Sequence, residues 1–263
     1  MGAQRMFLLT FGTELVPKAI SVLGADRKTI TAPIYGAVVE TSEGLVLLDT
    51  GIGRAALDDG DALAAIYGSQ RSPYGPEGDP LRVALAGLDL KVSDLSLAAV
   101  SHLHLDHTGG VPLLAEAGIP VAIQAEEIDY GHHRAALNTE LETAFYRSDY
   151  TGSVDWQRLE GASEIAPGVA VIPTPGHTPG HQSFRVDLPG TGAWILTADA
   201  ADLAENVHQA VPCGSVAEPS DAGRAASSTT TLLALAEQID ARVLPGHDPV
   251  VWKAAWHPPG GHR

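Results

Sequence analysis

The order of apolar and polar residues predicts short strands that alternate with helices along the chain. Residues 34–49, IYGAVVETSEGLVLLD, form two β-rich runs around the turn SEG, which predicts a hairpin whose second strand ends at Asp49. The apolar run near the start of the chain predicts a first strand, and residues 81–90 fit an amphipathic helix. The run LSLAAVSHLHLDH fits a strand that leads into a loop at His102.

The second half of the chain continues this pattern. It contains a short helix (VPLLAEAG), a strand (PVAIQ), a helical region from about Glu126 to Tyr146, further strands, and a helix (TTTLLALAEQI) before the strand RVLPGHD. Strands interleaved with helices predict an α/β layered fold. No repeat or linker divides the sequence, so we expect one domain over residues 1–263, with a lid over about residues 53–80 and a flexible tail over about residues 257–263.

Composition and charge narrow the classes of function. Hydrophobic residues make up 44% and charged residues 18% of the chain, which is typical of a globular protein. The formal net charge of −16 argues against a nucleic-acid partner and favours a soluble, cytoplasmic protein. No apolar stretch is long enough for a membrane span, and none stands out as an interface, so a homodimer stays open. Cys213, which we expect to be inert, is the only cysteine, so any metal must be held by nitrogen and oxygen.

The segment SHLHLDH, residues 101–107, places three histidines and one aspartate close together. Neutral imidazole and carboxylate groups are preferred zinc ligands, and short spacing on a turn lets them converge at little ordering cost. His102 and His104 can project from one side of the extended segment. Asp106 and His107 lie beyond the turn and can face a second ion. So many ligands in one segment predict two divalent ions.

Three more candidate ligands directly follow predicted strands, namely His177 in TPGHTPGH, Asp199 in LTADA and His247 in LPGHD. The edge of an α/β sheet where strands end is the usual place for a ligand. A carboxylate between two cations can bridge them, which suits Asp199. A single buried histidine is usually an ordinary core residue, but the seven candidate ligands taken together favour a metal site.

The same residues carry a resemblance to a known family. HLHLDH, Asp49 in LLDTG, His177, Asp199 and His247 resemble the metallo-β-lactamase superfamily along nearly the whole chain. Within it, SHLHLDHTGG, TPGHTPGHQS and the terminal PGHD are most similar to the N-acyl-homoserine lactonases, which are quorum-quenching lactonases. The resemblance implies an αβ/βα sandwich, in which helices flank two mixed β-sheets and a dinuclear site lies at the edge between the sheets.

The family's motif also implies a ligand set. Carried over to this sequence, one metal would be bound by His102, His104 and His177, and the other by Asp106, His107 and His247. Asp199 would bridge the two ions, which we expect to be zinc, with manganese, iron or cobalt as alternatives. Asp49 would either orient a ligand by hydrogen bonding or be a simple turn residue at a strand end. His181 would either brace the site or fill the turn.

The reaction implied by the resemblance is the opening of a lactone ring by a hydroxide that bridges the two metals. An N-acyl-homoserine lactone is the first candidate substrate, and Asp106 is a candidate for proton transfer. The lactonases place a tyrosine three residues after the bridging aspartate, whereas TADAAD places Asp202 there. Asp202 is then either a catalytic acid that donates when protonated or a solvated loop carboxylate. Tyr35, Tyr67 or Tyr74 would be replacement phenols.

Several other residues have two interpretations each. His132 and His133 lie in a charged helical stretch and are expected at the surface, with a place in the pocket as the alternative. Ile66 and Tyr67, with Trp156 elsewhere, would line a groove for an acyl chain or belong to the core.

Other functions remain open at this point. The same metal site would serve hydrolysis of another ester, a thioester or a heteroaromatic lactone, and a β-lactam substrate is not excluded. From a different class, a non-catalytic metal-binding protein could keep the fold. A redox protein is disfavoured because the chain lacks an HxExD motif and the length for a flavin domain.

Overall fold

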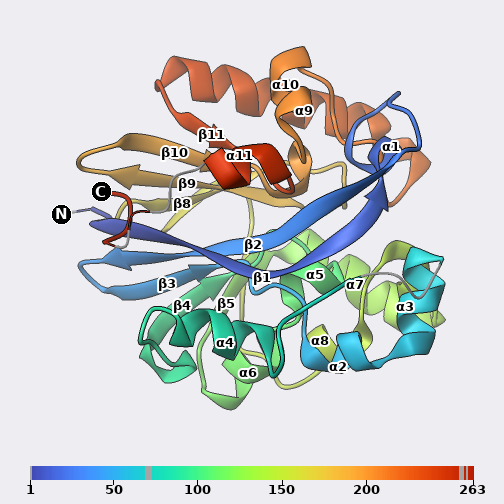
Figure 1. The fold of residues 1–263 in the computed structure, drawn as a ribbon, viewed down its shortest axis with the longest axis horizontal. Helices are drawn as coiled ribbons and strands as arrows, with labels where there is room; N and C mark the ends of the chain where they lie inside the picture. Colours follow the sequence, from blue (N-terminus) through green and yellow to red (C-terminus); the bar gives the residue numbers. More distant parts are fainter. Residues whose placement is uncertain (1, 69–72, 255–257, 259) are drawn as a thin grey trace.

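Two β-sheets pack face to face in the computed structural model, which describes residues 2–68, 73–254, 258 and 260–263 (Figure 1). The strands of the first sheet follow chain order: β1 (Arg5–Pro17), β2 (Thr29–Thr41), β3 (Gly44–Leu48), β4 (Leu95–Ala99), β5 (Val121–Gln124) and β6 (Trp156–Leu159). The pairs β1–β2 and β2–β3 are antiparallel, whereas β3 to β6 run parallel. The hairpin predicted from residues 34–49 is therefore confirmed as β2 and β3.

The second sheet is built from the later part of the chain. Its strands lie in the order β11 (Arg242–Leu244), β10 (Gly192–Leu196), β9 (Gln182–Leu188), β8 (Val169–Pro173) and β7 (Ser163–Ala166). Neighbouring strands are antiparallel except β10 and β11, which run parallel. Both sheets are thus mixed, as the family resemblance implied.

Helices cover the outer faces of the two sheets (Figure 1). Against the first sheet pack α4 (Pro80–Ala86), α6 (Val111–Glu116) and α7 (Ala125–Leu137), and against the second packs α10 (Ala222–Gln238). The shorter helices are α1 (Lys18–Ser21), α2 (Arg54–Asp58), α3 (Gly60–Tyr67), α5 (Leu105–Thr108), α8 (Arg147–Tyr150), α9 (Ala204–Gln209) and α11 (Pro249–Ala254). Single turns of 3-10 helix are η1 (Val92–Asp94), η2 (Glu140–Thr143), η3 (Ala198–Ala200) and η4 (Pro219–Asp221). Within the described ranges, no helix is both long and apolar enough to cross a membrane.

The strand β2 shows why parts of the sequence are apolar without interruption. Its residues Tyr35 and Val39 pack in the cluster between the sheets, together with Phe184 of β9. Its residues Ile34 and Val38 face the opposite way and pack under the helices of the first sheet. Because both faces of the strand are buried, both sets of positions are apolar. This layering of helix, sheet, sheet and helix confirms the αβ/βα sandwich.

The helical region expected up to Tyr146 is shorter in the structure. It breaks after α7, because Asn138 adopts a left-handed backbone conformation (φ 55°) that ends the helix. In the expected lid, residues 69–72 lie outside the described residues, and Tyr74 pairs with Thr13 of β1. In the expected tail, the backbone of His262 exchanges hydrogen bonds with Met6 of the same edge strand. The lid and the flexible tail stay predictions.

Candidate metal centre

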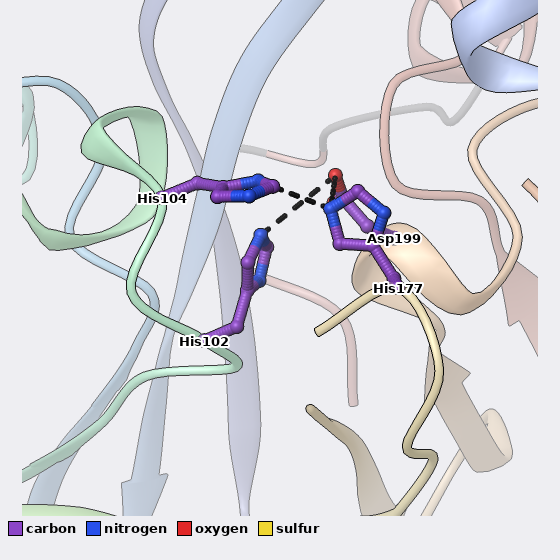
Figure 2. A group of neighbouring side chains, drawn as sticks. All are labelled: His102, His104, His177 and Asp199. Carbon is purple, nitrogen blue, oxygen red and sulfur yellow. Dashed lines mark hydrogen bonds and ion pairs between the residues drawn. The ribbon is translucent and has the colours of Figure 1, made fainter. Parts of the chain in front are cut away.

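The seven predicted ligands meet at one end of the sandwich, because each follows a strand that ends there. The segment after β4 supplies four of them, and the segments after β8, β10 and β11 supply one each. Their ligand atoms form two groups, each within 4.8 Å: His102, His104, His177 and Asp199 in one, and Asp106, His107 and His247 in the other. In the first group, His102 and His104 come from one segment and point toward His177 and Asp199, which come from two others (Figure 2).

The first group brings three imidazoles to one carboxylate oxygen. Nδ1 of His104 lies 3.0 Å from Nε2 of His177, which in turn lies 3.2 Å from Oδ2 of Asp199. Nε2 of His102 lies 3.9 Å from the same oxygen (Figure 2). Three nitrogens and one oxygen around a shared point are a donor set that suits zinc.

The second group meets the other oxygen of Asp199. Oδ1 of Asp199 lies 3.2 Å from Nε2 of His107 and 3.1 Å from Nε2 of His247. Oδ2 of Asp106 lies 3.3 Å and 3.7 Å from the same two nitrogens. One carboxylate therefore offers one oxygen to each group, which is the geometry that a bridging ligand needs.

Hydrogen bonds on the outer side of the imidazoles orient them toward the centre. Nδ1 of His177 lies 3.2 Å from the carbonyl oxygen of Ser215, and Nδ1 of His247 lies 2.9 Å from that of Pro33. A carbonyl oxygen only accepts, so Nδ1 carries the proton and Nε2 presents its lone pair to the centre. Nδ1 of His102 is similarly held by the hydroxyl of Ser101, at 2.9 Å.

Buried nitrogen atoms without a partner indicate that the site fits metal ions. Among the described residues, Nε2 of His102 and Nε2 of His107 are buried and have no hydrogen-bond partner. Leaving such an atom unsatisfied is costly in a folded protein. A divalent cation would satisfy both, since neutral imidazole nitrogen is a preferred ligand.

The charges at the centre divide the imidazoles into two sets. Burial lowers the pKa of His102 and brings the pKa of His104 to about 3. Burial alone would also lower the pKa of the other three imidazoles, but neighbouring acidic groups outweigh it and raise the pKa of His107, His177 and His247 well above the ordinary value. Burial alone would raise the pKa of Asp199, but His247 and the other histidines around it outweigh that effect and hold the pKa well below its usual range. In the same way His107 and His247 hold the pKa of Asp106 at about 2. A bound cation would displace the protons of the second set, because a ligand imidazole is neutral.

Asp49 orients the ligand segment and is more than a turn residue. Its Oδ1 accepts a hydrogen bond from the backbone N–H of Ser101 at 2.6 Å, and its Oδ2 lies 3.0 Å from Nδ1 of His107. The backbone of Asp49 is left-handed, with φ 56°, which turns the chain sharply at the end of β3. The strained residue thus ties β3 to the segment that carries four of the ligands.

His181 braces the site, whereas His132 and His133 are both exposed on α7. Nε2 of His181 accepts a hydrogen bond from the backbone N–H of Asp199 at 3.1 Å, and its Nδ1 lies 2.8 Å from the hydroxyl of Thr174. Both ring nitrogens are therefore engaged in positioning the bridging residue.

Glu127 of α7 joins the two ligand loops, a role that the sequence did not reveal. Its Oε1 accepts from the backbone N–H of Leu103 at 3.0 Å, and its Oε2 accepts from that of Gly180 at 2.9 Å. A Cβ atom at position 180 would lie 2.2 Å from the backbone nitrogen of Glu127, so this approach requires glycine. In the sequence AEEID, Glu127 is indistinguishable from a solvent-exposed helix residue.

A cavity of about 400 Å³ opens over the ligands. Its floor includes His104, Asp106, His177, Asp199 and His247. Its walls are formed by the end of β1 with α1, the end of α3, η2 and the segment 215–217, and their apolar residues include Leu15, Val16, Ile20, Ile66, Leu141 and Val216. Reactive and apolar surfaces therefore adjoin in one pocket.

Asp202 lines this cavity, so the interpretation of it as a solvated loop carboxylate is wrong. Its side chain is buried, and its Oδ1 has no hydrogen-bond partner among the described residues. Burial first, and then the charge of Asp199, raise the pKa of Asp202 well above its usual range.

Of the three candidate phenols, Tyr67 lines the cavity, and its hydroxyl lies 3.0 Å from Oε2 of Glu14. Tyr35 is buried outside it and donates to the carbonyl of Pro245, while Tyr74 is 55% exposed. Trp156 packs against the core under the helices of the first sheet, which is the second of its two interpretations.

Comparison with known proteins identifies the family whose sequences this chain matches. A family model described as the metallo-beta-lactamase superfamily matches residues 33–247. N-acyl homoserine lactonase from Bacillus cereus is 32% identical over 189 residues, which cover 70% of each protein. N-acyl homoserine lactonase AttM from Agrobacterium fabrum is 30% identical over 235 residues, which cover 82% of this chain and 86% of AttM.

A solved structure is also similar along its whole length. It is an N-acyl homoserine lactone hydrolase with the product N-hexanoyl-L-homoserine bound at its catalytic metal center. It matches this chain with a TM-score of 0.87 and 25% identity, and the match covers 100% of both chains.

Proposed function

Because the chain belongs to the metallo-beta-lactamase superfamily, we propose that it is a dinuclear metal-dependent hydrolase that opens the lactone ring of N-acyl-homoserine lactones. The observation that carries the proposal is the placement of Asp199, whose two oxygens face two separate ligand groups. The similarity to named lactonases from Bacillus cereus and Agrobacterium fabrum supports the substrate class.

The proposed ligands divide as the geometry groups them. His102, His104 and His177 would hold one ion, Asp106, His107 and His247 the other, and Asp199 both. Two bound divalent cations would supply a Lewis acid for the lactone carbonyl and a water of lowered pKa. The donor set, with five imidazoles and two carboxylates, favours zinc among the candidate metals. We also propose a cytoplasmic location, which the net charge of −16 favours, whereas the homodimer stays a prediction.

Two aspartates were catalytic candidates, and their surroundings separate them. Asp106 has a pKa of about 2, so it stays ionised and suits metal binding better than accepting a proton. Asp202 lines the cavity close to the bridging residue, with an oxygen that has no partner among the described residues. We propose that its carboxyl group, when protonated, donates a hydrogen bond to a substrate oxygen, the part that a phenol plays in the lactonases that the sequence resembles.

The apolar wall of the cavity would bind the acyl chain of the substrate. With the lactone at the floor, an aliphatic chain would extend along Leu15, Ile20 and Ile66. Burying a methylene there contributes about 0.8 kcal/mol. A thioester or a different lactone is the second candidate, because Asp202 presents an acid where the similar enzymes have a neutral phenol.

Proton release at neutral pH tests the function. The zinc-loaded protein would be offered short-chain and long-chain N-acyl-homoserine lactones, a simple γ-lactone, a thioester and a β-lactam, with His104→Ala as the inactive control. Rapid turnover of the acyl-homoserine lactones is expected, since ring opening produces one acid. If those compounds are inert while the thioester or another lactone reacts, the substrate assignment is wrong and the hydrolase assignment stands.

A further inference from the structure

Glu14 is a buried carboxyl group in the cavity that none of the roles above uses. Its side chain is 8% exposed, and its residue lines the same cavity as His104, Asp106 and His247. Oε2 faces the hydroxyl of Tyr67 at 3.0 Å. No lysine or arginine lies among the described residues that line the cavity.

An irregularity in β1 aims this side chain into the cavity. The register of β1 against β2 shifts between Thr10 and Gly12. Leu9 before the shift and Phe11 within it are both buried under the helices of the first sheet, whereas after the shift the even-numbered residues Glu14 and Val16 are buried. A β-bulge inverts the alternation of a strand in this way and commonly redirects a side chain beside an active site.

Tyr67 holds the carboxyl group in place. The phenol comes from the end of α3, across from β1, and burial raises its pKa well above the ordinary value, so the hydroxyl keeps its proton. It therefore donates to Oε2, so Oε1 is held in place and takes no part in this bond. Such an acceptor is suited to a ligand that brings an N–H or O–H donor.

We propose that Glu14, oriented by Tyr67, is a specificity residue that accepts a hydrogen bond from the amide N–H of an N-acyl-homoserine lactone. This inference rests on the function proposed above. The amide of that substrate lies between its ring and its acyl chain, and Glu14 lies between the metal floor and the apolar residues Leu15 and Ile66. A substrate without the donor would leave a buried acceptor unpaired, which is the strongest form of discrimination that a pocket offers.

The test compares two substrates that differ at one group. These are N-hexanoyl-homoserine lactone and its isostere with a methylene in place of the amide NH, each measured as kcat/KM with the zinc-loaded protein. The wild type is expected to prefer the amide by roughly 10- to 100-fold, which corresponds to the cost of leaving one hydrogen-bonding group unpaired in the occupied pocket. Equal rates for the two substrates in the wild type would overturn the proposal without any variant.

Variants assign the preference to the two residues. Glu14→Ala is expected to lose the roughly 10- to 100-fold preference for the amide and to leave the isostere within about twofold. Tyr67→Phe should lose part of it, mainly through KM, because the acceptor remains but is no longer held. Glu40→Ala is the matched control, since this glutamate pairs with Arg5 at the other end of the β1–β2 pair.

The outcomes also separate this inference from the proposed function. If the wild type hydrolyses neither lactone but cleaves the thioester, the substrate assignment fails. If the wild type hydrolyses the amide lactone and Glu14→Ala slows both substrates equally with unchanged zinc content, the role of Glu14 is refuted and the lactonase assignment stands.

Discussion

Two pairs of buried carboxyl groups line one cavity, and they differ in the side chains that surround them. Asp106 and Asp199 at the floor lie among imidazoles, which hold the pKa of both below the usual range. Glu14 and Asp202 on the wall lie among apolar residues and other carboxylates, so burial raises the pKa of Asp202 well above its usual range and that of Glu14 to about 7. The same functional group is thus prepared as an anion in one place and kept close to neutral in the other.

This difference separates the chemistry of the site from its selectivity. The proposed ligands follow the ends of four strands, and several are held by outer hydrogen bonds, so the floor could change little without losing bound ions. The wall carries two buried carboxyl groups in an apolar surface, and it can change residue by residue. The floor would therefore decide which bond is broken, and the wall would decide which molecule is admitted.

Removing a ligand from the floor of the cavity is expected to have the largest effect on metal content and activity. Asp199→Ala and His104→Ala should each leave the protein with fewer than two ions per chain, because the remaining ligands cannot complete both groups. Activity should fall by roughly 10³-fold or more, as expected when several kcal/mol of metal catalysis is lost. Metal analysis after dialysis checks this, with the exposed His132→Ala as the control. Full metal content in the Asp199→Ala protein would refute the bridging role.

The wall residue Glu14 is instead expected to change how the stability of the protein depends on pH. Glu14 has a pKa of about 7 in the fold against an ordinary 4.5, so the folded state binds its proton more tightly than the unfolded state does. The contribution of Glu14 to the free energy of unfolding is constant below pH 4.5. It falls by about 3 kcal/mol as the pH rises from 4.5 to above 7. In metal-free protein, the decline should be smaller by this amount in Glu14→Gln than in the wild type, because Asp202 and other buried carboxyl groups keep their own share of it. Urea unfolding at pH 4.5 and pH 8 measures the difference. Parallel curves for the wild type and the variant would argue against a buried, neutral Glu14.

The smallest expected effect comes from a residue behind the floor. Asp49→Ala removes the partner of His107 but no ligand, so metal affinity should fall by about 10- to 100-fold. Competition with a chelator measures this affinity. Asp187→Ala is a matched control, because that aspartate is partly exposed on β9 and pairs with Arg185. An Asp49→Ala protein that holds zinc as tightly as the control would show that His107 needs no orienting partner.

The grouping of the seven proposed ligands was largely predictable from the sequence. Four ligands lie within six positions, from His102 to His107, and the other three directly follow apolar runs that read as strands. The fold was predictable for the same reason, since runs such as that of β2 are buried on both faces and stay apolar. These signals depend only on residue type and spacing.

The residues that sequence reasoning missed depend on tertiary contacts. Glu127 lies in a charged stretch of α7, and only the packing of that helix against the ligand loops buries it. Glu14 faces the cavity because of a register shift in β1 that no residue pattern marks. Asp202 kept two interpretations because a carboxylate in a loop is usually solvated, and only the structure shows that it is buried.

The proposed ligands come from both sheets, so bound ions would stabilise the packing of one sheet on the other. The segment after β4 belongs to the first sheet, while His177, Asp199 and His247 follow strands of the second. A chain whose sheets have separated cannot present both ligand groups, so cations bind the native state and not the unfolded one. By mass action, an ion at a hundred times its dissociation constant would add about 2.7 kcal/mol to the free energy of unfolding. The supply of metal to the cell would then set the protein's lifetime as well as its activity.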